Sequence, residues 1–398
     1  MAITAKTKII HLVTDLNIGG AQKVVLDICS SADLEKYDLS IYSLGDGTDL
    51  LSTYDLDSRI KIRTFAYDFE DAFSFWAYLK RGLRPSVSFD HFRSLIDAVV
   101  TERPDILHLH LGARELNLGL LIQAKTGCEL VYTQHLTNLA RNSFGTTLLG
   151  IIFRLTYRKY WLIAVSRTIE EEIRKHSLVG RDRKLYLVEN KLNLSHFVPA
   201  PKQHRDYICV VYVARMSPVK AHHDLIRAWS LLKDEPTPKK LLLVGPDGMN
   251  NEMQLLAESL GVADTIEFVG PCDRVVELLN EADLAVFPSH QEGLPIALLE
   301  KMAMKLPVLV SDIPELTTII TDNVNGFVFR CGDRNELAAK LATLIRDPNL
   351  RKRFGDKARE TIEEHFGTTN IARPNELVYE EIVAGKASEE GPLRSIRV

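Results

Sequence analysis

Two glutamates, separated by an apolar pattern typical of a helix, have a spacing that suggests a binding or catalytic role. In the segment QEGLPIALLE, residues 291–300, Glu292 follows a predicted strand and Glu300 comes eight residues later. Pro295 suits the start of a helix, and the apolar residues on nearly every side of Glu300 predict that this helix is buried. A buried carboxylate needs a hydrogen-bonding partner. A sugar diol presents two adjacent hydroxyl donors to a bidentate acceptor and is one such partner.

Each of these glutamates also has a purely structural interpretation. Glu292 could cap the helix, and Glu300 could pair with a buried base. If both bind a ligand instead, the helix N-terminus between them favours a phosphate, because its backbone N–H groups point outward. Sugar hydroxyls and a phosphate held together describe a nucleotide-sugar.

A guanidinium and an ammonium group occur together in the segment VYVARMSPVKAHHDL. Arg215 ends a predicted strand, and Lys220 falls in the first turn of the predicted next helix. Ser217 is placed as the N-cap of that helix and Pro218 as its first residue. Two such cations at a helix N-terminus predict a pocket for a diphosphate. Two solvated charges beside a loop are the alternative.

A glycine pair, Gly19 and Gly20, follows the first predicted strand and precedes a helix with one apolar face. Glycines at this place let backbone N–H groups approach a ligand closely. A tight turn from strand to helix explains the pair equally well, because a glycine pair alone is a weak signal.

These candidate residues belong to a chain that alternates short β-branched runs with longer helical patterns, which is typical of parallel sheets covered by helices. The predicted strands cover residues 8–13, 37–44, 60–66, 105–110, 129–135, 160–166 and 184–190, then 207–215, 239–245, 265–270, 284–289, 307–311 and 326–329. The polar, proline-bearing segment 199–206 between the two sets is typical of a linker.

The predicted fold class is therefore α/β, with two Rossmann-like doubly wound domains facing a central cleft. The first domain covers residues 1–202 and the second residues 203–369, and a C-terminal helix at about 370–386 returns to the first domain. In such sheets ligands bind beyond the carboxyl ends of the strands, which is where the candidate residues fall.

Composition narrows the classes of function. The 398 residues carry a net charge of −4, which does not indicate a nucleic-acid partner. Five scattered cysteines without a C-x-x-C pair indicate neither a zinc site nor a disulfide framework. No apolar run approaches the ~20 residues that span a bilayer, so a cytoplasmic protein is expected. Basic and aromatic residues mix at 75–95 and 153–161, which leaves contact with the inner face of a membrane open beside an ordinary solvated helix.

Taken together, several segments resemble the retaining family 4 glycosyltransferases with the GT-B fold. FPSHQEGLPIALLEKMAMKLPVLVSD resembles the E-x7-E signature of that family, and VARMSPVK its strand-end arginine and helix-start lysine. LNIGGAQKV resembles the family's N-terminal glycine loop, and DILHLH and VYTQH its histidine-bearing strands. The resemblance runs from about residue 8 to about residue 385.

The resemblance implies a role for each matching residue. The implied donor-binding residues are Gly19, Gly20, Arg215, Lys220, Gly293, Leu294 and Glu300, with Arg215 and Lys220 on the diphosphate and Glu300 on the ribose hydroxyls. The implied catalytic residues are His135 beside the reacting carbon, Glu292 on the transferred sugar, and again Arg215 and Lys220.

The implied activity is that of a hexosyltransferase, in EC class 2.4, active in polysaccharide or lipid-linked glycan assembly. It would move a sugar from a UDP-, GDP- or ADP-linked donor to a hydroxyl of a glycan or lipid-linked acceptor, and the leaving diphosphate would deprotonate that hydroxyl. No metal or other cofactor is expected, because the two cations can stabilise the diphosphate charge. Pro295, Ala221 and Gln22 depart from the glycine, glycine and glutamate common in the family, which leaves sugar and acceptor open.

Three alternatives stay open at this point. A nucleotide-sugar 2-epimerase of the same fold would use no acceptor, and a non-catalytic sugar-nucleotide-binding subunit would bind without turnover. A dehydrogenase is disfavoured, because NIGGAQ lacks the G-x-G-x-x-G spacing.

His108 and His110 share one face of a strand, and two histidines without a third ligand are more often packing or hydrogen-bonding residues than metal ligands.

Overall fold

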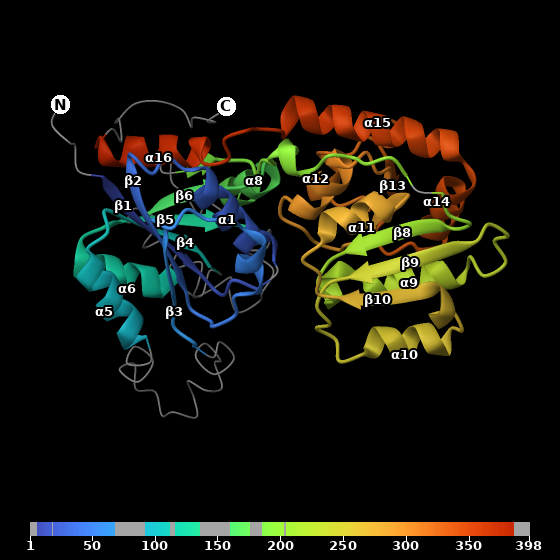
Figure 1. Cartoon of the computed structure of the whole chain (residues 1–398), viewed down its shortest axis with the longest axis horizontal. Helices are drawn as coiled ribbons and strands as arrows, with labels where there is room; N and C mark the ends of the chain where they lie inside the picture. Colours follow the sequence, from blue (N-terminus) through green and yellow to red (C-terminus); the bar gives the residue numbers. More distant parts are fainter. Residues whose placement is uncertain are drawn as a thin grey trace. The chain divides into compact units, whose positions relative to one another are not determined.

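The protein is described from a computed structural model, which covers residues 6–17, 19–67, 92–111, 116–135, 160–175, 185–202 and 204–385. Its contacts divide the chain into two compact units (Figure 1). One unit is formed by the residues up to Glu189 together with those from Asn370 onward, and the other by Asn190–Thr369.

The first unit is built on a parallel seven-stranded sheet with the order β3-β2-β1-β4-β5-β6-β7. Its strands are β1 (Thr7–Val13), β2 (Tyr37–Ser43), β3 (Lys61–Thr64), β4 (Ile106–His110), β5 (Glu129–Gln134), β6 (Trp161–Ala164) and β7 (Leu185–Leu187). Among its described residues, the helices are α1 (Gly20–Ser31), the 3-10 helix η1 (Asp49–Thr53), α5 (Arg93–Glu102), α6 (Leu116–Thr126), α8 (Arg167–Lys175) and α16 (Arg373–Val383). The strand order reverses between β1 and β4, which makes this pair the switch point of the sheet.

The second unit repeats the plan with a parallel six-stranded sheet in the order β10-β9-β8-β11-β12-β13. Its strands are β8 (Ile208–Val213), β9 (Lys239–Val244), β10 (Ile266–Gly270), β11 (Leu284–Phe287), β12 (Val308–Ser311) and β13 (Phe327–Phe329). Its helices are η4 (Leu194–His196), η5 (Pro218–Lys220), α9 (His222–Ser230), α10 (Glu252–Ser259), η6 (Ala263–Thr265), α11 (Val275–Glu281), α12 (Ile296–Ala303), α13 (Pro314–Thr317), α14 (Arg334–Arg346) and α15 (Pro348–His365). Here the switch point lies between β8 and β11.

The predicted α/β class and every predicted strand are confirmed. Most observed strands are shorter than predicted, because the polar residues that we attached to the carboxyl ends belong to the following loops. β11, for example, ends at Phe287, two residues before Ser289. Every residue of β4 is buried. Parallel strands are covered on both faces, which explains why apolar runs without polar alternation form strands in this protein.

α16 packs on the first sheet and corresponds to the helix predicted at about 370–386. Val378, Tyr379 and Ile382 lie in the same buried core as residues of β1, β2 and α1. The carboxylate of Glu376 accepts a hydrogen bond of 2.8 Å from the backbone N–H of Asp33. Figure 1 shows the red helix α16 beside the strands of this sheet.

The division between the units falls after Glu189, whereas we predicted a boundary near residue 203. The segment between these positions is fixed to the second unit by its backbone. Leu192 donates to the carbonyl of Phe366 at 2.9 Å, and Ala200 donates to the side chain of Asn280 at 2.8 Å. The polar, proline-bearing composition of this segment indicates a surface segment. It does not show to which unit backbone hydrogen bonds attach the segment, and the predicted boundary therefore differs from the observed one.

The two segments that mix basic and aromatic residues, 75–95 and 153–161, lie for the most part outside the described residues. Within the described part of the chain, no helix is both long and apolar enough to cross a membrane.

Candidate functional site

The loops that follow β8 and β11 carry most of the residues predicted to act in chemistry. β8 and β11 are neighbours in the sheet, with Val210 beside Leu284. Arg215 and Lys220 follow β8, and Glu292 follows β11. Because the strand order reverses between these two strands, their carboxyl ends form the place where parallel α/β sheets bind ligands.

Lys220 and Glu292 form an ion pair at this place. The Nζ atom of Lys220 lies 2.6 Å from Oε2 of Glu292, and the side chains are 25% and 6% exposed. Glu292 does not cap α12, because the N-cap residue is Pro295 and no side-chain capping bond is made there. Glu292 is thus not the N-cap residue of α12, and its carboxylate lies beside the predicted diphosphate cation.

Hydrogen bonds hold the two loops against each other. The hydroxyl of Tyr212, in β8, donates to the carbonyl of Lys220 at 2.9 Å and lies 3.0 Å from the Ser289 hydroxyl. The backbone N–H of His290 donates to the carbonyl of Val219 at 2.8 Å. The position of Lys220 relative to Glu292 is thus fixed by the backbone and by a buried tyrosine.

The start of the helix after β8 differs from the prediction. Lys220 does not lie in the first turn of α9. It ends the short 3-10 helix η5, and α9 begins at His222. Ser217 and Pro218 hold the predicted N-cap and first positions of η5, but the Ser217 side chain makes no capping bond. Between the two helices Ala221 adopts a left-handed conformation with φ 53°, which breaks the helical path.

Arg215 is exposed, in the loop after β8, and that loop runs beside the loop after β9. Met216 donates to the carbonyl of Pro246 at 2.9 Å. Gly245 has φ +141°, and a Cβ there would overlap the carbonyl oxygen of Ala214. A Cβ at Gly248 would lie 2.6 Å from the carbonyl oxygen of Met216. The two glycines of LLLVGPDG therefore permit the close approach that shapes the Arg215 loop.

Glu300 lies in α12 and is buried, as predicted, with 5% of its surface exposed. Its Oε2 atom is 3.4 Å from Nζ of Lys301, a lysine that is fully buried. The alternative interpretation, pairing with a buried base, thus also has a partner in the structure. Gly293 and Leu294 are buried in the turn before α12, where the carbonyl of Leu294 accepts a bond of 3.2 Å from the Asn190 side chain.

A polar cluster around Asp224 was not found from the sequence. Its Oδ1 atom accepts a hydrogen bond of 2.6 Å from Nε of Arg334, and its Oδ2 atom lies 3.0 Å from Nε2 of His290. His223 lies 3.4 Å from the same carboxylate. His290 lies two residues before Glu292 in the sequence, but Arg334 follows β13, so the sequence alone does not bring the two together.

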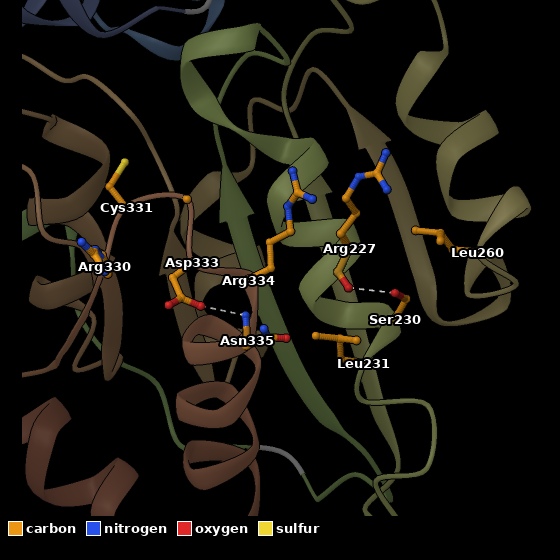
Figure 2. A pocket seen from close by; sticks show the side chains of 10 residues that line it. Arg227, Ser230, Leu231, Leu260, Arg330, Cys331, Asp333, Arg334 and Asn335 are labelled. Carbon is orange, nitrogen blue, oxygen red and sulfur yellow. Dashed lines mark hydrogen bonds between the residues drawn. The ribbon is translucent and has the colours of Figure 1, made fainter.

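A shallow pocket lies on the same unit between the C-terminal end of α9 and the loop before α14. Figure 2 shows Arg227 and Arg334 with their guanidinium groups pointing in the same direction, while Arg330 points elsewhere. Among the described residues that line this pocket, none was a predicted site residue.

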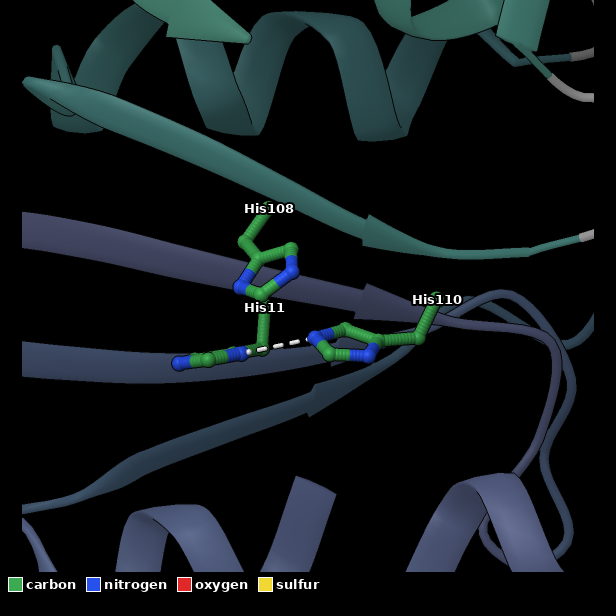
Figure 3. Close-up of side chains that lie close together, drawn as sticks. All are labelled: His11, His108 and His110. Atoms are coloured by element: carbon green, nitrogen blue, oxygen red, sulfur yellow. Dashed lines mark hydrogen bonds between the residues drawn. The ribbon is translucent and has the colours of Figure 1, made fainter. Parts of the chain in front are cut away.

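In the first unit, His135 follows β5 and ends a chain of histidines. Its Nε2 atom lies 3.1 Å from Nδ1 of His110, and Nε2 of His110 lies 3.0 Å from Nδ1 of His11 (Figure 3). Burial lowers the pKa of His135 to about 4, and it lowers the pKa of His11 to about 4 as well. His135 is therefore a neutral group near pH 7.

A third histidine, His11, lies beside His108 and His110 and was not identified from the sequence. In the sheet, His11 lies directly beside His108 of the neighbouring strand. Local sequence does not predict which residues of two strands lie side by side, so this pairing could not be found from the sequence. One nitrogen of each of His11, His108 and His110 lies within 4.8 Å of the others, so a metal could be considered. However, His108 is bonded to Tyr379 at 2.7 Å and to Thr133 at 2.6 Å. A metal would have to displace such bonds, and the arrangement fits a hydrogen-bonded chain better.

The glycine pair lies where predicted, at the N-terminus of α1. Gly19 is the N-cap, in an extended conformation, and Gly20 is the first helical residue. A Cβ on Gly20 would meet nothing within 4 Å, so packing does not require a glycine there. At Gly19 the obstacle is the flexible end of Gln22, whose amide donates to Asp15 at 3.3 Å.

Comparison with known proteins places this arrangement in a family. Residues 18–195 match the family described as Glycosyltransferase Family 4, and residues 197–361 match Glycosyl transferases group 1. EpsD of Bacillus subtilis (strain 168) is 30% identical over 291 residues, which cover 68% of this chain and 75% of EpsD. N-acetyl-alpha-D-glucosaminyl L-malate synthase of Bacillus anthracis is 25% identical over 292 residues, covering 71% of this chain and 76% of the synthase.

The chain belongs to glycosyltransferase family 4. It is a retaining glycosyltransferase that uses a nucleotide-sugar donor. The crystal structure of Anabaena Alr3699/HepE in complex with UDP and glucose matches it with a TM-score of 0.75 and 19% sequence identity, over 95% of this chain and 100% of that one. The two sheets thus have the GT-B fold that the resemblance implied.

Proposed function

We propose that this enzyme transfers a hexose from a UDP-linked donor to a hydroxyl of a glycan or lipid-linked acceptor. Two relatives support the choice of donor. The Bacillus anthracis synthase is named for an N-acetylglucosaminyl group, and the HepE structure holds UDP and glucose. The acceptor class is carried over from the family resemblance, as is a context in polysaccharide assembly.

The observation that carries the proposal is the Lys220–Glu292 pair at the switch point between β8 and β11. Lys220 would hold the diphosphate of the donor together with Arg215, because both cations follow the same strand. Glu292 would turn toward a hydroxyl of the transferred sugar, and Glu300 would accept hydrogen bonds from the ribose. Gly293 and Leu294 would offer backbone N–H groups between them.

The chemistry follows from where charge develops. As the bond between the sugar and the diphosphate breaks, negative charge grows on the leaving phosphate oxygens, and fixed cations stabilise it. The diphosphate would take the proton of the acceptor hydroxyl on the face from which it leaves, so the anomeric configuration is kept. Arg215 and Lys220 would then supply the stabilisation without a metal ion.

Each unit has a part in this proposal. The unit with Lys220 and Glu292 would bind the donor, and the other unit would serve the acceptor side, where Gly19 and Gly20 would contact the donor and His135 would lie beside the reacting carbon. His135 would contact a substrate oxygen as a neutral imidazole, because burial lowers its pKa to about 4.

A thermal-shift screen in EDTA tests the donor class. UDP, GDP, ADP and their common sugar conjugates would each be added to the protein, with NAD as the unrelated nucleotide. We expect stabilisation by UDP and a UDP-hexose and no shift with NAD. A shift with GDP or ADP alone would change the donor assignment, and a shift with NAD alone would contradict a nucleotide-sugar site.

A further inference from the structure

The histidine chain in the first unit has a direction that hydrogen-bond accounting can determine. His11 is fully buried and His110 is 4% exposed, while His135 is half-buried at the end of β5. The two links are His11 Nδ1 to His110 Nε2 at 3.0 Å and His110 Nδ1 to His135 Nε2 at 3.1 Å. Both distances are those of N–H···N hydrogen bonds.

Each ring in this chain has one proton to give. Burial lowers the pKa of His110 well below its ordinary value and that of His11 to about 4, so the imidazoles are neutral near pH 7. A neutral imidazole donates from one nitrogen and accepts at the other. His110 uses its single N–H in one link and accepts in the other, so both hydrogen bonds must point the same way along the chain.

Two directions satisfy this condition, and they differ at the buried end. If the bonds run inward from His135, the proton of His11 sits on Nε2. If they run outward, that proton sits on Nδ1, and Nε2 of His11 is an unprotonated acceptor. Nε2 of His11 is buried without a hydrogen-bond partner. Figure 3 shows this nitrogen turned away from His110.

The outward direction avoids the costlier defect. Among backbone groups, a buried N–H without an acceptor is rarer than a carbonyl without a donor, and we infer the same preference for these ring nitrogens, where each unsatisfied group costs about 1–3 kcal/mol. With Nε2 of His11 unprotonated, His11 donates to His110, and His110 donates to Nε2 of His135. The single proton of His135 must then be on Nδ1, for which the described residues provide no hydrogen-bond partner.

We propose that His110, backed by His11, is a positioning residue that holds His135 in the tautomer protonated on Nδ1, so that His135 donates a hydrogen bond to a substrate oxygen. The tautomer of His135 does not depend on the proposed function. Only the identity of the substrate that supplies the oxygen rests on it. A donor held in one tautomer is preorganised for an oxygen that gains negative charge, whereas a mixture of tautomers would present a donor only part of the time.

His108 provides a matched control. It is as buried as His110, and the two ring centroids are 4.0 Å apart. It is bonded to Tyr379 and Thr133 and takes no part in the chain. Replacing His108 by phenylalanine should disturb packing about as much as the same change at His110, without removing the donor to His135.

The first measurement is the nitrogen-15 spectrum of the histidine rings in the full-length, substrate-free protein. Signals of His135 are assigned by their loss in His135→Asn. We expect an Nδ1 signal typical of a protonated nitrogen and an Nε2 signal typical of an unprotonated one in the wild type and in His108→Phe. In His110→Phe the two signals should move toward an average, because the donor to Nε2 is gone. A wild-type ring protonated on Nε2 would overturn the proposal.

Sugar transfer provides the second readout. His110→Phe should lower kcat about tenfold relative to His108→Phe, the value of roughly one hydrogen bond. Equal kcat in the two variants, with wild-type transfer present, would refute the positioning role. Absence of transfer by the wild type with any donor would instead contradict the proposed function, and the tautomer result would still stand. If His110→Phe does not fold, the wild-type spectrum alone decides.

Discussion

At the scale of single residues, the pairing of Lys220 with Glu292 is the feature with the clearest consequences. The sequence assigned these residues separately, one to a diphosphate and the other to a sugar, and the structure joins them at 2.6 Å. The carboxylate therefore competes with a diphosphate for the ammonium group. Binding of the nucleotide and transfer of the sugar should respond differently to its removal.

Glu292→Gln tests this separation. The substitution keeps the shape of the side chain but removes the charge that occupies Lys220. We expect the affinity for UDP to stay the same or increase, while transfer falls by about tenfold or more, because a neutral amide holds a sugar hydroxyl less strongly than a carboxylate. Calorimetry with UDP and a transfer assay measure the two effects. A parallel loss of UDP affinity and transfer would show that Glu292 only supports the loop.

Ala221 leads to a prediction about stability. Its φ of 53° costs a residue with a Cβ about 1 kcal/mol of backbone strain. A glycine at this position would relieve that strain but would lose a buried methyl group. Ala228 is equally buried but lies inside α9, where glycine relieves nothing. We expect Ala228→Gly to lower the free energy of unfolding by about 1–2 kcal/mol more than Ala221→Gly. Equal losses in urea titrations would contradict the strain at Ala221.

At the scale of elements, α16 is a helix from the end of the chain that packs on the histidine-bearing strands of the first unit. Its Tyr379 hydroxyl lies 2.7 Å from Nδ1 of the buried His108, so the helix contacts the histidine strands directly. A helix far along the chain thus completes the core beneath β1 and β4.

Tyr379→Phe isolates this contact. The change leaves Nδ1 of His108 buried without a partner, which should cost about 1–3 kcal/mol. Tyr207→Phe is the control, because that side chain is 37% exposed in the second unit. Chemical unfolding of both variants measures the difference. A loss no larger than that of the control would mean that the hydroxyl adds nothing to the packing of α16.

The elements also show what sequence reasoning could and could not reach. Strands were predictable because buried parallel strands are continuous apolar runs, and the residues after β8 and β11 were correctly placed at strand ends. The helix start at Ser217 and Pro218 was predicted correctly, but the break between η5 and α9 was missed, because the left-handed turn at Ala221 has no signal in an alanine. His11 was missed because it joins His108 through sheet register, which is a property of the assembled sheet.

At the scale of the whole molecule, the buried histidines make stability depend on pH. For His11 the pKa falls from 6.5 in the unfolded chain to about 4 in the folded protein. Above pH 6.5 neither state binds this proton, and no stability is lost. As the pH falls below 6.5 the unfolded state takes up the proton first, so stability decreases until the pH reaches about 4. His108 and His110 shift in the same direction.

The expected loss from His11 alone between pH 6.5 and 5 is roughly 2 kcal/mol. Urea titrations at pH 7 and pH 5 would therefore give a lower unfolding midpoint at pH 5. His365→Gln is the control for the loss of one imidazole, because that side chain is 64% exposed. A midpoint that stays constant between the two pH values would contradict a neutral, buried histidine chain.

The central claim is that the loops after β8 and β11 bind the diphosphate of a UDP-sugar through Lys220. The most direct measurement is calorimetric binding of UDP to the wild type, Lys220→Ala and Lys305→Ala in EDTA. Lys305 is a surface lysine of the same unit, 3.3 Å from Asp356. We predict that Lys220→Ala weakens UDP binding at least tenfold and lowers transfer by about 10², while Lys305→Ala matches the wild type. Undiminished UDP binding by Lys220→Ala would contradict the assignment of the site.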